Sequence, residues 1–110
     1  MLTIFEAIAD PTRRHILELL REKPRLVGDL AELLEISQPG TSKQLKVLRE
    51  AGLVDVRQDK QRRWYELRPE PLAELDAWLL PYRQLMEARY NRLDNLLDEL
   101  QAKDNNDEQT

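Results

Sequence analysis

Polar and cationic side chains recur along one side of the segment Ser37–Val54, which reads SQPGTSKQLKVLREAGLV. Thr41, Leu45 and Leu48 are spaced i, i+4 and i+7, a pattern that predicts the inner face of a helix. The outer side presents glutamine, lysine and serine, which can hydrogen-bond to adenine edges, to guanine edges and to either base. These residue types at this spacing predict recognition of double-stranded DNA. The candidates for base contacts are Gln38, Ser42, Lys43 and Gln44.

Positive charge is concentrated in the same third of the chain. The whole sequence has a net charge of -4, yet residues 37–68 hold eight Lys or Arg and only four Asp or Glu. Such cations bind phosphate oxygens, which sets affinity and register without reading the bases. A charge cluster alone is more often a solvated face, and the helix and hairpin around this one favour the DNA interpretation. We expect backbone contacts from Thr41, Lys46, Arg49, Lys60, Arg62 and Arg63.

The residue types that catalysis and metal binding require are scarce. The sequence has no cysteine and a single histidine, His15, so neither a thiolate site nor a histidine cluster can form. The carboxylates are spread through amphipathic segments without a nucleophile beside them. We therefore expect no enzyme activity, no metal and no cofactor, and we interpret His15 as a structural residue.

Start and stop signals divide the first half of the chain into helices. Asp10 followed by Pro11 predicts a helix over residues 11–22, because aspartate caps free amides and proline lacks one. A short helix should precede it, and another is expected over residues 27–34. Ser37 then caps a helix over residues 38–51 that ends at Gly52. The last two helices match the helix-turn-helix pattern.

Two strands are expected next, over residues 53–58 and 63–67, because these stretches are rich in Val, Trp and Tyr. The polar residues 59–62 between them form a cationic turn. A helix-turn-helix followed by a hairpin predicts a winged helix, mostly α with a small β-hairpin. In that arrangement helix 38–51 enters the major groove and the wing, residues 53–67, lies on the backbone or in the minor groove.

A long apolar stripe follows. From Leu72 to Leu100 apolar residues recur alternately every three and four positions, with Arg89 as the one polar member. This seam predicts a long helix that requires a packing partner, although part of it could pack on the second helix of the same chain. Pro81 should kink or break the helix near Leu80. Trp78 and Tyr82 could line a ligand pocket or simply belong to the packed core.

The motifs together resemble the ArsR-type winged-helix repressors of bacteria and archaea. The resemblance covers about residues 5–100 and is carried by DPTRRHILELL, by VGDLAELLEISQPGTSKQLKVLREAGLV and by RRWYEL. It implies a homodimer built from the first and last helices, which binds an operator with imperfect twofold symmetry and represses transcription. The implied interface residues are Leu2, Phe5, Leu79, Tyr82, Met86, Leu93 and Leu96.

The sequence departs from the metal-sensing members of that family. They carry cysteines at the positions matching Val27 to Asp29, or ligands including histidine on the last helix, and this chain has neither. The resemblance is therefore to the branch that lacks the cysteine metal-sensor motif. Any small-molecule or protein inducer is left open.

We expect one DNA-binding and dimerisation domain over residues 1–102 and a disordered polar tail over residues 103–110. No apolar run approaches the roughly 20 residues that span a bilayer, so a cytoplasmic location without membrane contact is expected. One alternative is a winged helix that mainly binds another protein, its DNA binding weak or lost, which the acidic net charge favours slightly.

Overall fold

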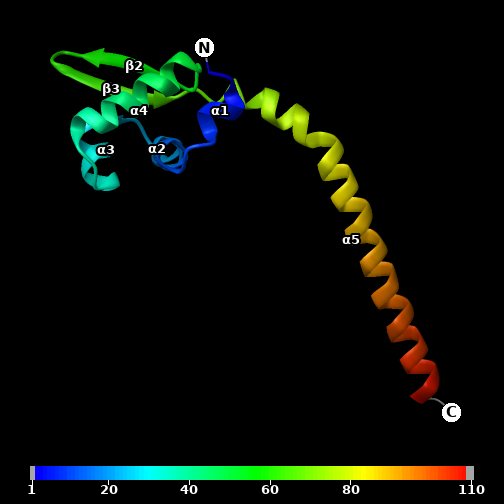
Figure 1. Cartoon of the computed structure of the whole chain (residues 1–110). Coiled ribbons are helices and arrows are strands. Elements are labelled where there is room, and N and C mark those ends of the chain that lie inside the picture. Colours follow the sequence, from blue (N-terminus) through cyan, green and yellow to red (C-terminus); the bar gives the residue numbers. More distant parts are fainter. Residues whose placement is uncertain (1, 109–110) are drawn as a thin grey trace. The chain divides into compact units, whose positions relative to one another are not determined.

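The computed structural model describes residues 2–108 of the chain (Figure 1). It divides into two units, Met1–Leu75 and Asp76–Thr110, which are described separately. The elements, in chain order, are α1 (Ile4–Ile8), α2 (Pro11–Glu22), β1 (Arg25–Leu26), α3 (Val27–Leu34), α4 (Gln38–Glu50), β2 (Val54–Asp59), β3 (Arg62–Leu67) and α5 (Leu72–Glu108).

Three helices of the first unit, α1, α2 and α4, start at a residue whose side chain accepts a hydrogen bond from the first helical turn. Thr3 accepts a hydrogen bond from the backbone N–H of Glu6, and Asp10 accepts one from that of Arg13. Ser37 does the same for Gly40, at 3.0 Å between Oγ and N. Each cap satisfies one of the amides that a first helical turn leaves without a partner. The starts predicted for α2 and α4 are confirmed.

Replacing Ser37 with alanine should lower the free energy of unfolding by about 1 kcal/mol, because the Gly40 amide loses its acceptor. Urea denaturation followed by circular dichroism measures this loss. Ser42→Ala is the matched control, since Ser42 is exposed on the same helix and should change stability by less than about 0.5 kcal/mol. Equal losses in the two variants would show that the cap contributes nothing specific.

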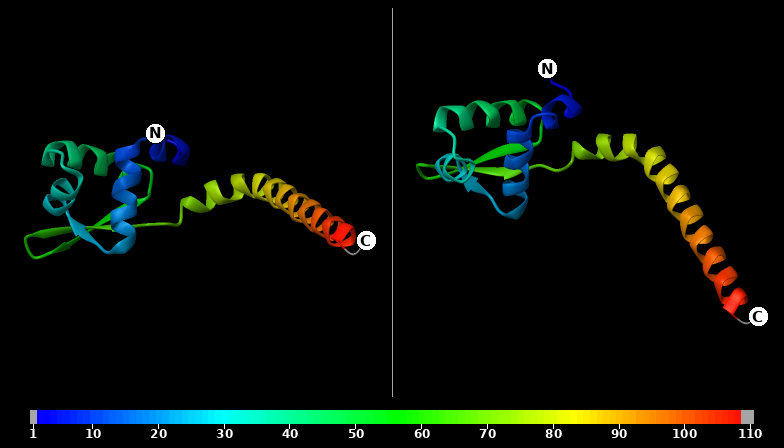
Figure 2. Two further views of the ribbon diagram at one scale, coloured as in Figure 1. Left: turned by 90° about the horizontal axis from the view of Figure 1, so that it is seen from below. Right: turned by 60° about the horizontal axis from the view of Figure 1, so that its bottom comes forward.

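The core of the first unit lies where α2, α3 and α4 meet the sheet. Ile16 of α2, Leu30 of α3 and Leu48 of α4 are fully buried. Leu53, just before β2, and Tyr65 of β3 are also buried and complete the core on the side of the hairpin. Figure 2 shows α2, α3 and α4 lying together beside the hairpin. The core therefore holds the outer side of α4 at a fixed angle to the wing.

The sheet has three strands rather than the two expected, in the order β1-β3-β2, all antiparallel. The extra strand, β1, pairs Arg25 with Tyr65 and Leu26 with Trp64. A strand of two residues is too short for any alternation to be visible in the sequence. The hairpin is also tighter than expected, since Asp59 pairs with Arg62 across a turn of Lys60 and Gln61.

The second unit consists of the larger part of α5. The helix runs without interruption through Pro81, so a break near Leu80 is excluded, and the predicted kink stays a prediction. The neighbouring side chains are exposed, and a carbonyl that loses its partner at proline can therefore be hydrated. The helix extends to Glu108, past Ala102 where we expected it to fray. The division into residues 1–102 and a disordered tail stays a prediction, and residues 109–110 lie outside the described part.

Although α5 is long, neither it nor any other helix among the described residues is apolar enough to cross a membrane.

Candidate nucleic-acid interface

The outer side of α4 carries the polar residues that the sequence predicted. Gln38, Ser42 and Lys43 are exposed, and so are Lys46 and Arg49 further along the helix. The inner side is formed by Thr41, Leu45 and Leu48, all buried. One helix thus presents a row of hydrogen-bonding and cationic groups while its other side is fixed in the core.

The first turn of α4 approaches α3 closely. A Cβ atom at Gly28 would lie 3.3 Å from Nε2 of Gln38, which is tighter than ordinary van der Waals contact. Glycine at this position therefore leaves room for the Gln38 amide across the start of α3. This close contact was not foreseen from the sequence.

Thr41 does not belong to the exposed surface. Its side chain has 0% exposure, and its hydroxyl donates a hydrogen bond to the carbonyl oxygen of Ser37 at 2.9 Å. A hydroxyl that is buried and already bonded to the backbone cannot reach a phosphate while the fold is intact. The prediction that Thr41 contacts the DNA backbone is corrected accordingly.

Gln44 lies apart from the other candidates for base contacts. It is half-buried, and its Oε1 accepts a hydrogen bond from Nη1 of Arg13 in α2 at 3.1 Å. A glutamine reads adenine with both its oxygen and its nitrogen, and here the oxygen is occupied. Gln44 is therefore placed by the structure as a contact between helices, and the base candidates on the exposed side are Gln38, Ser42 and Lys43.

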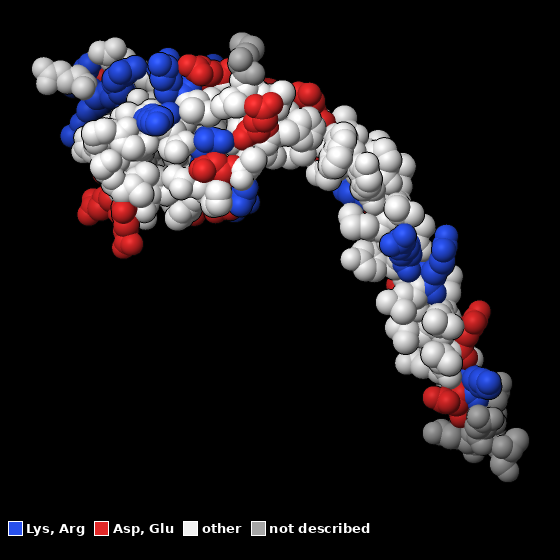
Figure 3. All heavy atoms as spheres, in the orientation of Figure 1, with Lys and Arg blue, Asp and Glu red and all other residues white. Residues whose placement is uncertain are grey.

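The wing presents its cations at the tip. Lys60, Arg62 and Arg63 are exposed there, and Figure 3 shows Lys and Arg side chains gathering over the hairpin. Lys60 has a positive φ of 58°, which the tight turn requires. The wing tip and the outer side of α4 are the two places where the structure exposes the predicted phosphate contacts.

Two further cations of the basic region are held in ion pairs along the sheet. Arg57 Nε lies 2.7 Å from Glu66 Oε1, and the hydrogen bond from Arg57 to Glu66 raises the pKa of the guanidinium. Arg68 Nη2 lies 2.6 Å from Asp55 Oδ2 and lowers the pKa of that carboxyl through the same kind of bond. These pairs offset positive charge along the sheet, so within the wing the predicted phosphate contacts are the cations at the tip.

The residues implied in a dimer interface are largely accessible. In the first unit Leu2 is half-buried and Phe5 of α1 is exposed. In the second unit the side chains of the seam are exposed along α5, half-buried Leu79 excepted. The rings of Trp78 and Tyr82 contact each other in a tilted arrangement, with centroids 4.8 Å apart and planes at 37°. The exposed apolar residues of the seam are Tyr82, Met86, Leu93, Leu96 and Leu100.

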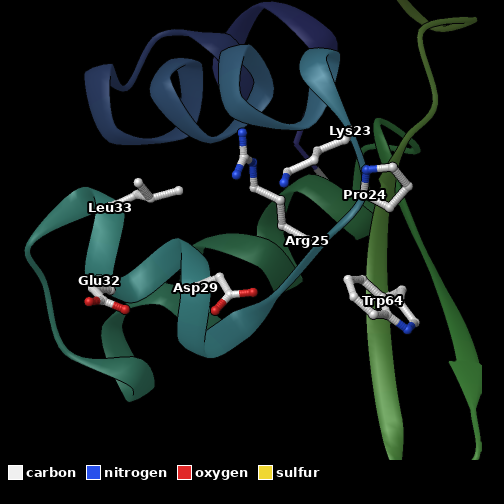
Figure 4. A pocket seen from close by; sticks show the side chains of 7 residues that line it. All are labelled: Lys23, Pro24, Arg25, Asp29, Glu32, Leu33 and Trp64. Atoms are coloured by element: carbon white, nitrogen blue, oxygen red, sulfur yellow. The ribbon is translucent and has the colours of Figure 1, made fainter.

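A hollow of about 560 Å³ lies between the end of α2, α3 and β3 (Figure 4). Trp64 of β3 is half-buried and stands beside Pro24. Arg25 is fixed there by bonds from Nε to the carbonyl oxygen of Leu19 and from Nη2 to Glu22. Among the described residues no group of three His, Cys, Asp or Glu is placed to hold a metal ion.

Comparison with known proteins identifies relatives of this chain. A family model described as bacterial regulatory protein, arsR family, matches residues 10–56. The transcriptional repressor SdpR of Bacillus subtilis is 37% identical over 82 residues, which cover 74% of this chain and 91% of the relative. The HTH-type transcriptional regulator Rv2034 of Mycobacterium tuberculosis is 48% identical over 71 residues, covering 64% of this chain and 66% of the relative.

Solved structures give the same result for the fold. A possible transcriptional regulator for arsenical resistance matches with a TM-score of 0.68 and 39% identity, covering 74% of this chain and 85% of that one. The homodimeric winged helix-turn-helix DNA-binding domain of Mb0332 from Mycobacterium bovis matches with a TM-score of 0.58 and 29% identity, covering 71% of this chain and 72% of that one. The winged helix predicted from the sequence is confirmed.

Proposed function

The chain belongs to the ArsR family of bacterial regulatory proteins, and we propose on this basis that it is a homodimeric repressor of transcription acting in the cytoplasm. As a member of that family it is a DNA-binding transcriptional regulator and not an enzyme. Repression is the function named for its relatives SdpR and the arsenical resistance operon repressor of Escherichia coli. The proposal assigns the same direction of control to this chain.

The observation that carries the proposal is the outer side of α4. A helix fits the major groove of B-DNA, and its N-terminal side chains meet the base edges there. In this chain the N-terminal half of α4 exposes Gln38, Ser42 and Lys43, while Lys46 and Arg49 follow in the next turns. The first three would read bases, and the cations of the helix and of the wing tip would bind phosphates.

A dimer would place two such helices on one side of the duplex. The related domain of Mb0332 is homodimeric, and α5 of this chain exposes an apolar seam that a second copy can cover. Two recognition helices of a dimer bind half-sites about 34 Å apart, one turn of DNA. The operator would then have imperfect twofold symmetry.

Selection of bound fragments from genomic DNA tests the proposal. A sequence-specific dimer should enrich a motif with two related half-sites, and its affinity should fall steeply as salt is raised, because bound phosphates release counterions. A protein-interaction module whose DNA binding has been lost would enrich no motif. That outcome would overturn the proposal.

Replacing Lys60 and Arg62 together with alanine should weaken binding to all DNA sequences alike. The slope of log affinity against log salt should fall by about one for each phosphate contact removed. Arg57→Ala is the matched control, because Arg57 belongs to the same hairpin but is paired with Glu66. If the wing variant changed sequence preference and left the slope unchanged, the wing would be reading bases and its assignment would be reversed.

A further inference from the structure

Arg13 of α2 forms hydrogen bonds with both α1 and α4, the recognition helix. Its Nε donates to the carbonyl oxygen of Ala7 at 2.7 Å, and its Nη2 donates to that of Glu6 at 3.0 Å. Its Nη1 donates to Oε1 of Gln44 in α4 at 3.1 Å. One half-buried guanidinium thus contacts the last turn of α1 and the side of the recognition helix.

The hydrogen bonds of Arg13 require a fixed geometry. A guanidinium offers only donors, arranged in a rigid plane, so its acceptors must lie at matching positions. The carbonyl groups in the last turn of a helix lack i+4 amide partners within the helix, and Arg13 donates to two of them in α1. The Glu6 carbonyl also accepts from the backbone N–H of Ala9 at 3.2 Å. Gln44 must present its oxygen to the third donor. Moving α4 relative to α1 would therefore break a charge-assisted bond in a partly buried place.

We propose that Arg13 is a positioning residue that fixes the recognition helix relative to α1 and so sets the spacing of the two recognition helices in the dimer. The inference rests on the proposed function and on the implied dimer interface, in which Leu2, before α1, and Phe5 of α1 contact the partner subunit. Because α1 is then tied to the partner subunit, any looseness between α1 and α4 changes the distance between the two copies of α4. Arg13 acts through Gln44, and the proposal gives it no direct contact with DNA.

Arg14, the next residue, provides a matched comparison. Its Nη1 donates to the carbonyl oxygens of Ile8 at 2.9 Å and Ala9 at 3.1 Å. Both hydrogen bonds that the described structure gives its side chain therefore go to the end of α1 and the residue after it, and neither goes to α4. Removing Arg14 takes away a similar charge and a similar cap on α1 while the bond between Arg13 and Gln44 stays in place.

The experiment compares affinity for the selected operator with affinity for the same operator carrying one extra base pair at its centre. The extra pair moves the half-sites apart by about 3.4 Å and rotates them, so the full-length wild-type dimer should lose at least about tenfold in affinity. In Arg13→Met this penalty should shrink by about fivefold or more, a size expected for interacting pairs. Gln44→Met should reproduce the effect, and the double variant should be no worse than either single one.

Arg14→Met should keep the wild-type spacing penalty, whatever its thermal stability. A residue with a merely structural role would lower the melting temperature and leave the spacing penalty unchanged, and that result in both Arg13→Met and Gln44→Met would overturn the inference. If Arg13→Met does not fold, the result with Gln44→Met decides alone. A wild-type protein that enriches no operator would overturn the proposed function and this inference with it, whereas unaltered spacing selectivity overturns the inference alone.

Discussion

Replacing Leu93 with aspartate should convert the dimer to a monomer and lower affinity for the operator by at least about a hundredfold. Leu93 is 52% exposed on α5 and lies in the apolar seam, so in a dimer it would be covered by the partner. Burying a lone carboxylate among apolar side chains costs several kcal/mol, and each 1.4 kcal/mol is about tenfold in an equilibrium constant. Each monomer would then bind a single half-site without the gain from linkage.

Sedimentation equilibrium at micromolar concentration, followed by binding to operator DNA, measures both effects. Leu80→Asp is the matched control, because Leu80 is also exposed on α5 but lies outside the alternating spacing of the seam. It should remain dimeric and bind DNA as the wild type does. A fully dimeric Leu93→Asp protein would place this residue outside the interface.

Replacing Ser42 and Lys43 together with alanine should abolish most of the preference for the operator over random DNA. A well-placed base contact discriminates by about 1–3 kcal/mol, and the dimer carries two copies of each, so the ratio of specific to non-specific affinity should fall at least about a hundredfold. Both side chains are exposed on the N-terminal half of α4, and their removal leaves the core untouched. Circular dichroism should therefore show an unchanged fold.

Competition binding with operator and random duplexes measures this ratio. Lys23→Ala removes the same charge just past the end of α2, at the hollow of Figure 4, whose lining includes no residue of α4, and should leave the ratio within about twofold of the wild type. The assignment of α4 to base reading would fail if the double variant lost affinity for both duplexes equally.

The helices of the first unit could be predicted because their boundaries are local. Asp10 and Pro11 mark the start of α2, and Ser37 marks that of α4, by chemistry that depends only on neighbouring residues. The burial of Leu45 and Leu48 follows from helical spacing in the same way. The sequence alone therefore predicted which side of α4 is exposed, and three of the four candidates for base contacts lie on that side.

Features that depend on residues distant in the sequence could not be predicted. Strand β1 is two residues long and exists only because β3 lies beside it. Arg13 and Arg14 look alike in the sequence, and only the fold separates the one that reaches Gln44. Thr41 was predicted to contact the DNA backbone although its helical spacing put it on the inner face of α4, where the structure buries it.

Chemical footprinting of guanine N7 on the selected operator tests the central claim most directly, because this atom lies in the major groove. With the dimer bound, we expect two protected clusters whose centres are about 10 base pairs apart, on one side of the duplex. Both clusters should disappear together in Leu93→Asp at concentrations that saturate the wild type. A single cluster, or bound DNA whose guanine N7 atoms stay unprotected, would contradict the insertion of paired α4 helices into successive major grooves.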